Sequence, residues 1–409
     1  MEILDITDFG AVGNGEYVCT KEIQRAIDLC PKGGCVRIPE GVFVSGALYL
    51  KSNMTLHLEE GAKLLGSSNV EDFPVKGYPY EGLDQLCYAS LINTDGAPYE
   101  NITISGQGVI DANGCAIFKA ELSDPRIKRG RAACIRNTKN LVIRDVTFRQ
   151  SPAWCLHTIY CDGILMEGVQ VHSKYNENGE KYGMHNCDGM DIDSCQNVVI
   201  RNCLISSQDD CIAVKSGRDA EGRRVGIPSK NIVIEDCKFV SGFGVAMGSE
   251  LSGGVEDVYV RNCVFEDTFS LASVKAIRGR GNYIRNIHYE NCKHKNTSLE
   301  YKDTKWFRGA IYLDGFYGSG EFDADKAETV DDGTPIIEDI YFKDLDVETV
   351  AGNVIYLYGL PERHYRNIYM ENVRAHGKYG MKVKNIDNLQ IKNVKVTCDE
   401  GEAGEGVEL

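Results

Sequence analysis

The sequence predicts an all-β protein, folded as a single-stranded parallel β-helix with a short N-terminal capping helix. Three observations predict it: a strand-like motif returns along the chain, turn residues separate its copies, and helical patterns are almost absent. The chain has 43 glycines and only 10 prolines, which favours tight turns over proline-rich linkers. A repeat of roughly 20–50 residues is typical of stacked structural units. Leucine-rich repeats are the alternative, but their leucine consensus is missing.

The recurring motif reads Asn or Asp, apolar, any, apolar, polar, then Asn, Asp or Gly, then Cys or Val. Its alternating apolar residues predict a strand with one buried face. We expect the repeated Asn and Cys side chains to stack in ladders that close turns and fill the core. The clear copies begin at Asn140, Asp162, Asn197, Asn231, Asp257, Asn286, Asp339, Asn367 and Asn388, and looser copies at Asn53 and Asn101.

One helix is expected near the N-terminus, where it would cover the open first coil of the solenoid. Thr20 is the expected N-cap. Apolar residues then follow at helical spacing, at Ile23, Ala26, Ile27 and Cys30. No change in composition marks a second domain, so we expect residues 1–409 to form one parallel β-helix domain.

Charge and composition exclude several classes of partner. Lys and Arg number 45 against 60 Asp and Glu, a net charge of −15, which argues against nucleic acid and anionic membranes. No apolar run is long enough to span a bilayer. The first residues lack the pattern of a signal peptide, and the sixteen cysteines include no Cys-x-x-Cys pair. We therefore expect a cytoplasmic, reduced protein, or a secreted one if a signal was removed. The oligomeric state stays open.

Three carboxylates are the most unusual chemical feature. Asp188 and Asp209 are 21 residues apart, which is one short coil of the repeat, and Asp210 follows directly. Side chains one coil apart lie on neighbouring rungs, about 4.8 Å apart at the backbone. Like charges this close cannot all ionise, so one group is expected to serve as a proton donor beside ionised acceptors. Such pairs catalyse glycoside hydrolysis. A calcium site or solvated turn acids are the alternatives, although the spacing does not fit an EF-hand.

At these residues the sequence resembles glycoside hydrolase family 28, the polygalacturonase-like, pectin-acting family of right-handed parallel β-helices, in its bacterial type. The resemblance covers nearly the whole chain. It rests on four segments in the family's order: the opening Asp8–Gly15, Ser151-Pro152-Ala153-Trp154-Cys155-Leu156-His157, Asn186-Cys187-Asp188 and Gln208-Asp209-Asp210.

The resemblance implies an inverting glycosidase that needs neither a metal nor an organic cofactor. Asp209 would be the general acid, and Asp188 and Asp210 would hold and deprotonate the attacking water. Asn186 and Gln208 would lie at the substrate site, although Gln208 is equally well explained as a structural amide. The partner would be an oligosaccharide or glycoside: a galacturonide or a related pectin-derived plant glycoside.

The sequence departs from the family at two cationic positions. The family's Gly-His-Gly motif here contains Phe243, a candidate for stacking on a sugar and equally an ordinary packed aromatic. The family's Arg-Ile-Lys motif here begins with Ser273, so the bidentate fork of Arg is lost. Lys275 remains, and we expect it to bind the carboxylate of a uronate substrate.

Three further residues are candidates for replacing the lost cations. Arg278 and Arg280 follow Lys275 closely and are otherwise expected to be solvated turn charges. His185 directly precedes Asn186 and is the alternative source of an imidazole, although an ordinary turn histidine explains it as well. All three are therefore expected substrate-binding residues.

Exo-action on short oligosaccharides is favoured over cleavage of long chains, because the net charge would repel a long polyanion. The inserts at 72–89 and 111–131 are candidates for closing one end of the cleft. Two alternatives stay open: a calcium-dependent polysaccharide lyase on the same fold, and a non-catalytic β-helix that binds glycans.

Overall fold

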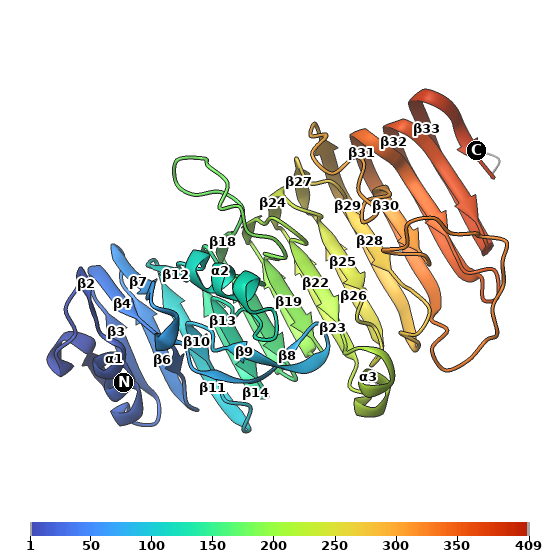
Figure 1. Cartoon of the computed structure of the whole chain (residues 1–409). Coiled ribbons are helices and arrows are strands. Elements are labelled where there is room, and N and C mark those ends of the chain that lie inside the picture. Colours follow the sequence, from blue (N-terminus) through green and yellow to red (C-terminus); the bar gives the residue numbers. More distant parts are fainter. Residues whose placement is uncertain (1, 407–409) are drawn as a thin grey trace. The chain divides into compact units, whose positions relative to one another are not determined.

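The computed structural model describes residues 2–406, which divide into two compact units (Figure 1). The first runs from the N-terminus to Tyr80 and from Asp84 to Asp209, and the second comprises Glu81–Leu83 and the chain from Asp210 onward. Both units are stacks of parallel strands, so the predicted all-β parallel β-helix is confirmed. The single domain over residues 1–409 stays a prediction.

In the first unit, strands pair in parallel with the strands of the next coil. For example, β13 pairs with β16 and β16 with β19, with Leu156 between Ala133 and Met190. The paired strands are β1 Ile3–Asp5, β2 Asn14–Val18, β3 Gly34–Ile38, β4 Gly41–Ser45, β5 Leu48–Tyr49, β6 Met54–Leu58, β7 Ala62–Gly66, β10 Ile92–Asn93, β11 Tyr99–Gly106, β12 Val109–Asp111, β13 Ala133–Arg136, β14 Thr138–Arg144, β15 Thr147–Arg149, β16 Leu156–Ile159, β17 Asp162–Glu167, β18 Gln170–His172, β19 Met190–Asp193, β20 Gln196–Arg201 and β21 Leu204–Ser206. A separate hairpin is formed by β8 Val75–Tyr80 and β9 Leu83–Tyr88.

The second unit continues the same pattern with longer strands. The run β23, β26, β29, β31, β32 and β33 forms one continuous parallel ladder. The strands are β22 Ile212–Lys215, β23 Ser229–Glu235, β24 Lys238–Ser241, β25 Val245–Gly248, β26 Val255–Arg261, β27 Val264–Glu266, β28 Ala272–Lys275, β29 Tyr283–Asn296, β30 Gly309–Asp314, β31 Ile336–Tyr358, β32 Tyr365–Lys384 and β33 Ile386–Glu405.

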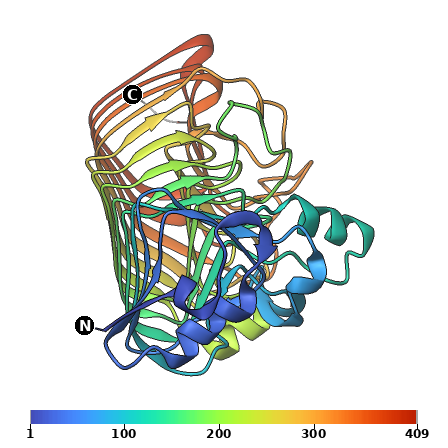
Figure 2. The ribbon, with the colours of Figure 1, turned by 90° about the vertical axis from the view of Figure 1, so that its left-hand side faces the viewer.

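Helices are short and lie outside the strand ladders. They are η1 Ile6–Phe9, α1 Thr20–Leu29, η2 Val70–Asp72, α2 Cys115–Ser123 and α3 Asp219–Val225. The predicted capping helix is α1, seen in blue in Figure 2, which packs on η1 and β5 and buries Ile23, Ala26 and Ile27. Among residues 2–406, no helix is long and apolar enough to cross a membrane.

The predicted N-cap of α1 is off by one residue. Thr20 is already helical, and Cys19 takes the cap position without a side-chain cap hydrogen bond. The Thr20 hydroxyl instead accepts a hydrogen bond from the Gly46 backbone N–H at 2.7 Å. The hydroxyl therefore ties the helix to the strand region that it covers.

The repeat motif places residues in the left-handed conformation at two positions. Every copy that begins with Asn has a φ of 54–61° at that residue, and so do Asp257 and Asp339. In the copy at Asp162, Gly163 takes this conformation instead, with φ 77°. The sixth position is left-handed as well, from Asp145 to Asn393. Asn, Asp and Gly tolerate this conformation best, which explains why the motif uses them.

The predicted Asn ladder and the predicted core are both confirmed. The amide of Asn140 donates to the Asn101 side chain at 3.0 Å, and that of Asn101 donates to Asn53 at 2.8 Å. The apolar motif positions, such as Ile232 and Ile234, are fully buried. All sixteen cysteines are free thiols and fourteen of them are buried, so they act as small core residues.

Replacing Asn140 tests the left-handed position. Asn140→Ala removes the bond to Asn101 and forces a Cβ-bearing residue without a local hydrogen bond into φ 56°. We expect it to lose about 1 kcal/mol more stability than Asn140→Gly, because only glycine adopts this conformation without strain. Urea denaturation followed by circular dichroism measures the difference. An alanine variant as stable as the glycine variant would contradict this account.

Candidate active site

The loop before β19 presents the first predicted catalytic carboxylate. Asn186 has a φ of 51°, which turns the chain sharply before the buried Cys187 and Asp188. The Ser173 hydroxyl donates to the Cys187 carbonyl at 2.7 Å, and the Cys155 N–H donates to the Asp188 carbonyl at 2.9 Å. Backbone bonds to neighbouring coils thus fix the position of Asp188, which is 3% exposed.

The next coil brings Asp209 to Asp188. The Gln208 N–H donates to the Cys187 carbonyl at 3.2 Å, and the Gln208 side-chain oxygen accepts from the Cys187 N–H at 3.5 Å. The Asn186 amide lies 3.5 Å from an Asp209 carboxylate oxygen. The carboxylates of Asp188 and Asp209 approach within 4.8 Å, and Asp209 is half-buried. The predicted one-coil spacing therefore brings these two acids together, and Gln208 supports the loop.

Asp210 begins the second unit, where it is paired with Lys275. The Lys275 ammonium lies 2.7 and 2.6 Å from the two Asp210 carboxylate oxygens, and both residues are 4% exposed. The expected partner of Lys275 was a substrate carboxylate, but the structure gives it a carboxylate of the protein. The pair neutralises two buried charges.

A buried arginine that sequence reasoning missed organises the Asn186 loop. Arg129 is 2% exposed and forms an ion pair with Glu121 of α2. Its guanidinium donates to the carbonyls of Pro152 and His185, to the Tyr80 hydroxyl and, at 3.4 Å, to the Asn186 side-chain oxygen. In the sequence Arg129 lies in the charged run Lys128–Arg131, which looks like a solvated turn, so no local signal reveals its burial.

His185 is exposed beside this network. Its ring packs edge-on against Phe118 of α2, with ring centres 5.1 Å apart. Burial and the nearby Arg129 guanidinium lower the pKa of His185, so its imidazole is neutral at pH 7. A neutral imidazole cannot replace a lost cation, but it can hydrogen-bond to a sugar hydroxyl.

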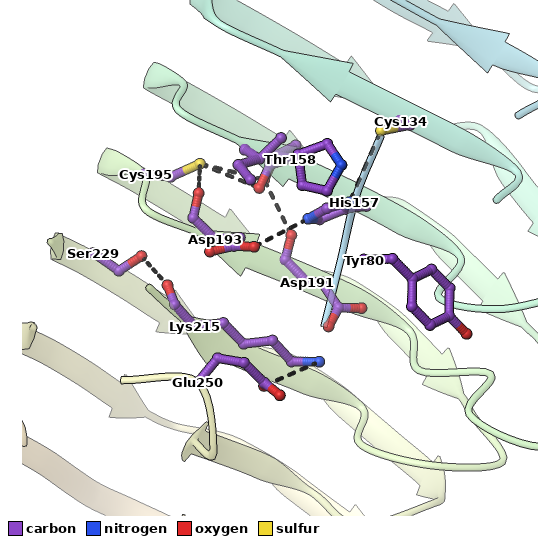
Figure 3. Close-up of polar contacts among 12 residues, drawn as sticks. Tyr80, Cys134, His157, Thr158, Asp191, Asp193, Cys195, Lys215, Ser229 and Glu250 are labelled. Atoms are coloured by element: carbon purple, nitrogen blue, oxygen red, sulfur yellow. Dashed lines mark hydrogen bonds and ion pairs between the residues drawn. The ribbon is translucent and has the colours of Figure 1, made fainter. Parts of the chain in front are cut away.

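The Ser-Pro-x-Trp-x-x-His segment, residues 151–157, contributes buried side chains next to the loop that carries Asn186. Trp154 stacks on Tyr80 with ring centres 5.1 Å apart. His157 is fully buried, and Figure 3 shows it between Cys134 and Asp193, at 3.8 and 3.4 Å. In the second unit, Figure 3 shows a similar buried pair, Lys215 and Glu250, 4.0 Å apart.

Phe243, a candidate for stacking on a sugar, lies in a buried aromatic cluster of the second unit. Only 6% of it is exposed, and it belongs to a buried cluster with Phe269, Phe307 and Ala351. Its ring lies 5.3 Å from that of Phe269 and 5.0 Å from that of Tyr301. This packing agrees with the alternative of an ordinary packed aromatic, and sugar stacking by Phe243 stays a prediction.

Arg278 and Arg280 bind protein carboxylates, and their role as substrate cations stays a prediction. Arg278 grips Glu362 through two hydrogen bonds of 2.6 and 2.8 Å. Arg280 bonds to Asp219 of α3 at 2.5 Å and to the Ser249 carbonyl at 3.0 Å. These contacts hold loops together, so neither guanidinium replaces the family's missing Arg.

The geometry defines a class of protein: a parallel β-helix that brings two carboxylates close together, the arrangement that acid–base chemistry uses. The two acids also offer oxygen ligands of the kind that Ca²⁺ binds, but calcium takes six to eight such ligands. Proton transfer in a carbohydrate site therefore fits this pair better than a resident metal does.

Comparison with known proteins agrees. The profile of glycosyl hydrolases family 28 matches residues 36–398, and the chain belongs to this family of glycosidases. It is 31% identical to a probable polygalacturonase of Vitis vinifera. The alignment of 386 residues covers 91% of this chain and 74% of that protein.

Two further relatives extend this picture. An exo-poly-alpha-D-galacturonosidase of Dickeya chrysanthemi is 30% identical over 348 residues, which is 73% of this chain and 56% of that protein. The crystal structure of a hyperthermoactive exopolygalacturonase from Thermotoga maritima superposes with a TM-score of 0.78 at 24% identity, over 95% of this chain and 92% of that one. The last likeness confirms the fold.

Breaking the Lys275–Asp210 pair is expected to destabilise the protein. Lys275→Met keeps the side-chain length but leaves Asp210 buried without its counter-charge, which should lower the free energy of unfolding by about 3–5 kcal/mol. Lys275→Met/Asp210→Asn should recover most of this loss, because no uncompensated charge remains. Urea denaturation of both variants measures the coupling. Equal stabilities of the single and double variants would contradict the buried pair.

Proposed function

We propose that the protein is an inverting, exo-acting galacturonidase that removes sugar units from short galacturonan-derived oligosaccharides. Asp209 donates a proton to the leaving glycosidic oxygen, and Asp188 and Asp210 hold and deprotonate the water. The single observation that carries the proposal is the approach of the Asp188 and Asp209 carboxylates within 4.8 Å. The substrate follows the names of the Vitis and Dickeya relatives.

The environment of each acid suits its proposed role. Asp209 is half-buried, so it reaches both the protein interior and a substrate. Asp188 is nearly inaccessible and is held by backbone bonds, which is suited to positioning a water molecule. The Lys275 ammonium stabilises the ionised form of Asp210, the form that accepts a proton.

The first unit also supports exo-action. The predicted insert 111–131 forms α2, whose Phe118 and Glu121 contact His185 and Arg129. The other insert supplies Tyr80 at the end of β8, whose hydroxyl accepts from Arg129. Both inserts therefore pack against the loop that carries Asn186, where they can limit the substrate to one chain end. The Dickeya relative is named as an exo-acting enzyme.

The stereochemical outcome rests on the family resemblance. Inverting pairs are usually roughly 6.5–9.5 Å apart, and retaining pairs about 5–5.5 Å. Asp188 and Asp209 each bring one carboxylate oxygen to within 4.8 Å of the other. The anomer of the first product therefore decides between water and Asp188 as the nucleophile.

A cytoplasmic, reducing location is part of the proposal. Sixteen free cysteines, fourteen of them buried, are typical of proteins kept reduced. In that compartment the substrates would be small, imported oligosaccharides, which agrees with exo-action.

Asp209→Asn should lower the turnover number roughly 10²–10⁴-fold on galacturonide oligosaccharides while the fold is retained, because the general acid is lost. Product chromatography measures the rate and identifies the sugar and the end attacked. Proton NMR of the wild-type reaction should show a first product with the opposite anomeric configuration. A folded Asp209→Asn variant with wild-type activity would remove Asp209 from the mechanism, and retention of configuration would overturn the assigned roles.

Removal of divalent cations separates the hydrolase from the lyase alternative. We expect full activity after exhaustive treatment with EDTA and no ultraviolet-absorbing unsaturated product, because carboxyl groups alone give a proton to the leaving oxygen and take one from water. The assay follows reducing ends and ultraviolet absorbance in parallel. Activity that needs added calcium and yields an unsaturated sugar would identify a lyase instead.

A further inference from the structure

An exposed tryptophan lies in the second unit on the segment between β29 and β30. Trp306 is 45% exposed, although the neighbouring Phe307 is 4% exposed and packs in the cluster with Phe243. Its ring centre lies 5.3 Å from that of Tyr317, and the Lys305 ammonium lies 4.6 Å from the centre of the indole. Isolated exposed apolar residues are common and need no explanation by themselves. The fixed position of this ring and of its neighbours, however, does call for an explanation.

The backbone around Trp306 is fixed on both sides. The Tyr312 hydroxyl donates to the Trp306 carbonyl at 3.4 Å. Arg308 bonds to the buried carboxylate of Asp314 at 2.9 Å and to the Ser319 carbonyl at 3.2 Å. An indole held in this way pays little conformational entropy when it binds a ligand.

A glycine lets the indole lie directly against the opposite segment. Gly318 has a φ of 75°, and a Cβ at this position would lie 2.4 Å from a ring atom of Trp306. Any other residue would push the ring away. The segment around Gly318 is therefore shaped to seat the indole, and 45% of Trp306 stays exposed to solvent.

The seated indole is connected to the proposed catalytic carboxylate by short contacts. Lys275 bonds to Asp210 at 2.6 Å, and its ammonium lies 5.1 Å from the centre of the Tyr317 ring. Tyr317 in turn contacts Trp306. Three contacts in series therefore link the indole to Asp210 within the second unit.

We propose that Trp306 and Lys305 form a binding subsite for a uronic-acid residue of the substrate, away from the bond that is cleaved. The exposed part of the indole receives the apolar C–H face of the sugar ring. The Lys305 ammonium leaves the indole and pairs with the sugar carboxylate. This inference rests on the proposed function and adds to it a residue pair that selects for acidic oligosaccharides.

The same arrangement explains the Phe243 substitution. Phe243 and Phe269 pack beneath Phe307, the residue that anchors Trp306 in the core. A polar His at position 243 would need a hydrogen-bond partner inside this apolar cluster. The departure from the family therefore supports the segment that carries the proposed subsite.

Binding is measured with an Asp209→Asn background, which prevents turnover. The chain has two tryptophans, so the fluorescence change that is lost in a Trp306→Phe control is the part that reports on Trp306. Titration with tetragalacturonate should shift this fluorescence and protect it from acrylamide quenching. In calorimetry, Trp306→Ala should weaken the Kd for tetragalacturonate about 10-fold. Digalacturonate, which is too short to reach the subsite, should bind both proteins equally.

Two further comparisons separate a subsite from a general structural effect. Gly318→Ala should weaken tetragalacturonate binding as Trp306→Ala does, whereas Gly320→Ala should not, because nothing lies within 4 Å of a Cβ there. Lys305→Met should weaken the binding of tetragalacturonate but not of its methyl ester, which lacks the carboxylate charge.

The outcomes distinguish this inference from the proposed function. An unchanged Kd for tetragalacturonate in Trp306→Ala, or equal losses for digalacturonate and tetragalacturonate, overturns the subsite and leaves the galacturonidase in place. Equal effects of Lys305→Met on the acid and its ester overturn the selection for uronate. If no galacturonide binds or is hydrolysed by the wild-type protein, the proposed function fails and the subsite fails with it.

Discussion

The copies of the repeat motif begin at or next to a residue in the left-handed backbone conformation, and the arrangement of the site depends on this constraint. Asn, Asp or Gly at this position lets the chain turn without strain, and the amides of neighbouring coils then bond to one another, as Asn140 does to Asn101. Because the turns stack, residues one coil apart arrive at the same place on successive rungs. This is how Asp188 and Asp209 approach each other across 21 residues of sequence.

Buried ion pairs hold the polar residues around the carboxylates. Arg129 with Glu121 fixes the loop of Asn186 in the first unit, and Lys275 with Asp210 neutralises a catalytic carboxylate in the second. Each pair is costly to bury and is tolerated because hydrogen bonds satisfy the charged groups. Such pairs fix the orientation of a site, which proton transfer between closely spaced groups requires.

The loss of two family cations has different structural consequences. At position 243 a phenylalanine stands in place of the family's histidine and packs in an apolar cluster. This cluster supports the segment that carries the solvent-exposed indole of Trp306. At Ser273 no other guanidinium takes the place of the family's Arg. Arg278 is paired with Glu362, and Arg280 is paired with Asp219. The subsite that we propose at Lys305 would recognise an acidic substrate at a distance from the cleaved bond.

The sequence by itself determined the parallel β-helix, the turn ladders, the capping helix and the pair Asp188–Asp209. All of these follow from local patterns, namely the repeat period, the Asn and Asp positions and the one-coil spacing, and motif resemblance supplied the roles. Only the tertiary structure decided the partners of Lys275, Arg278 and Arg280, the burial of Phe243 and the central position of Arg129. These depend on inserted loops that meet residues tens of positions away, such as Arg129 with Tyr80. The charge of a side chain can be read from the sequence, but the counter-charge it meets is set by long-range packing, which leaves no periodic signal.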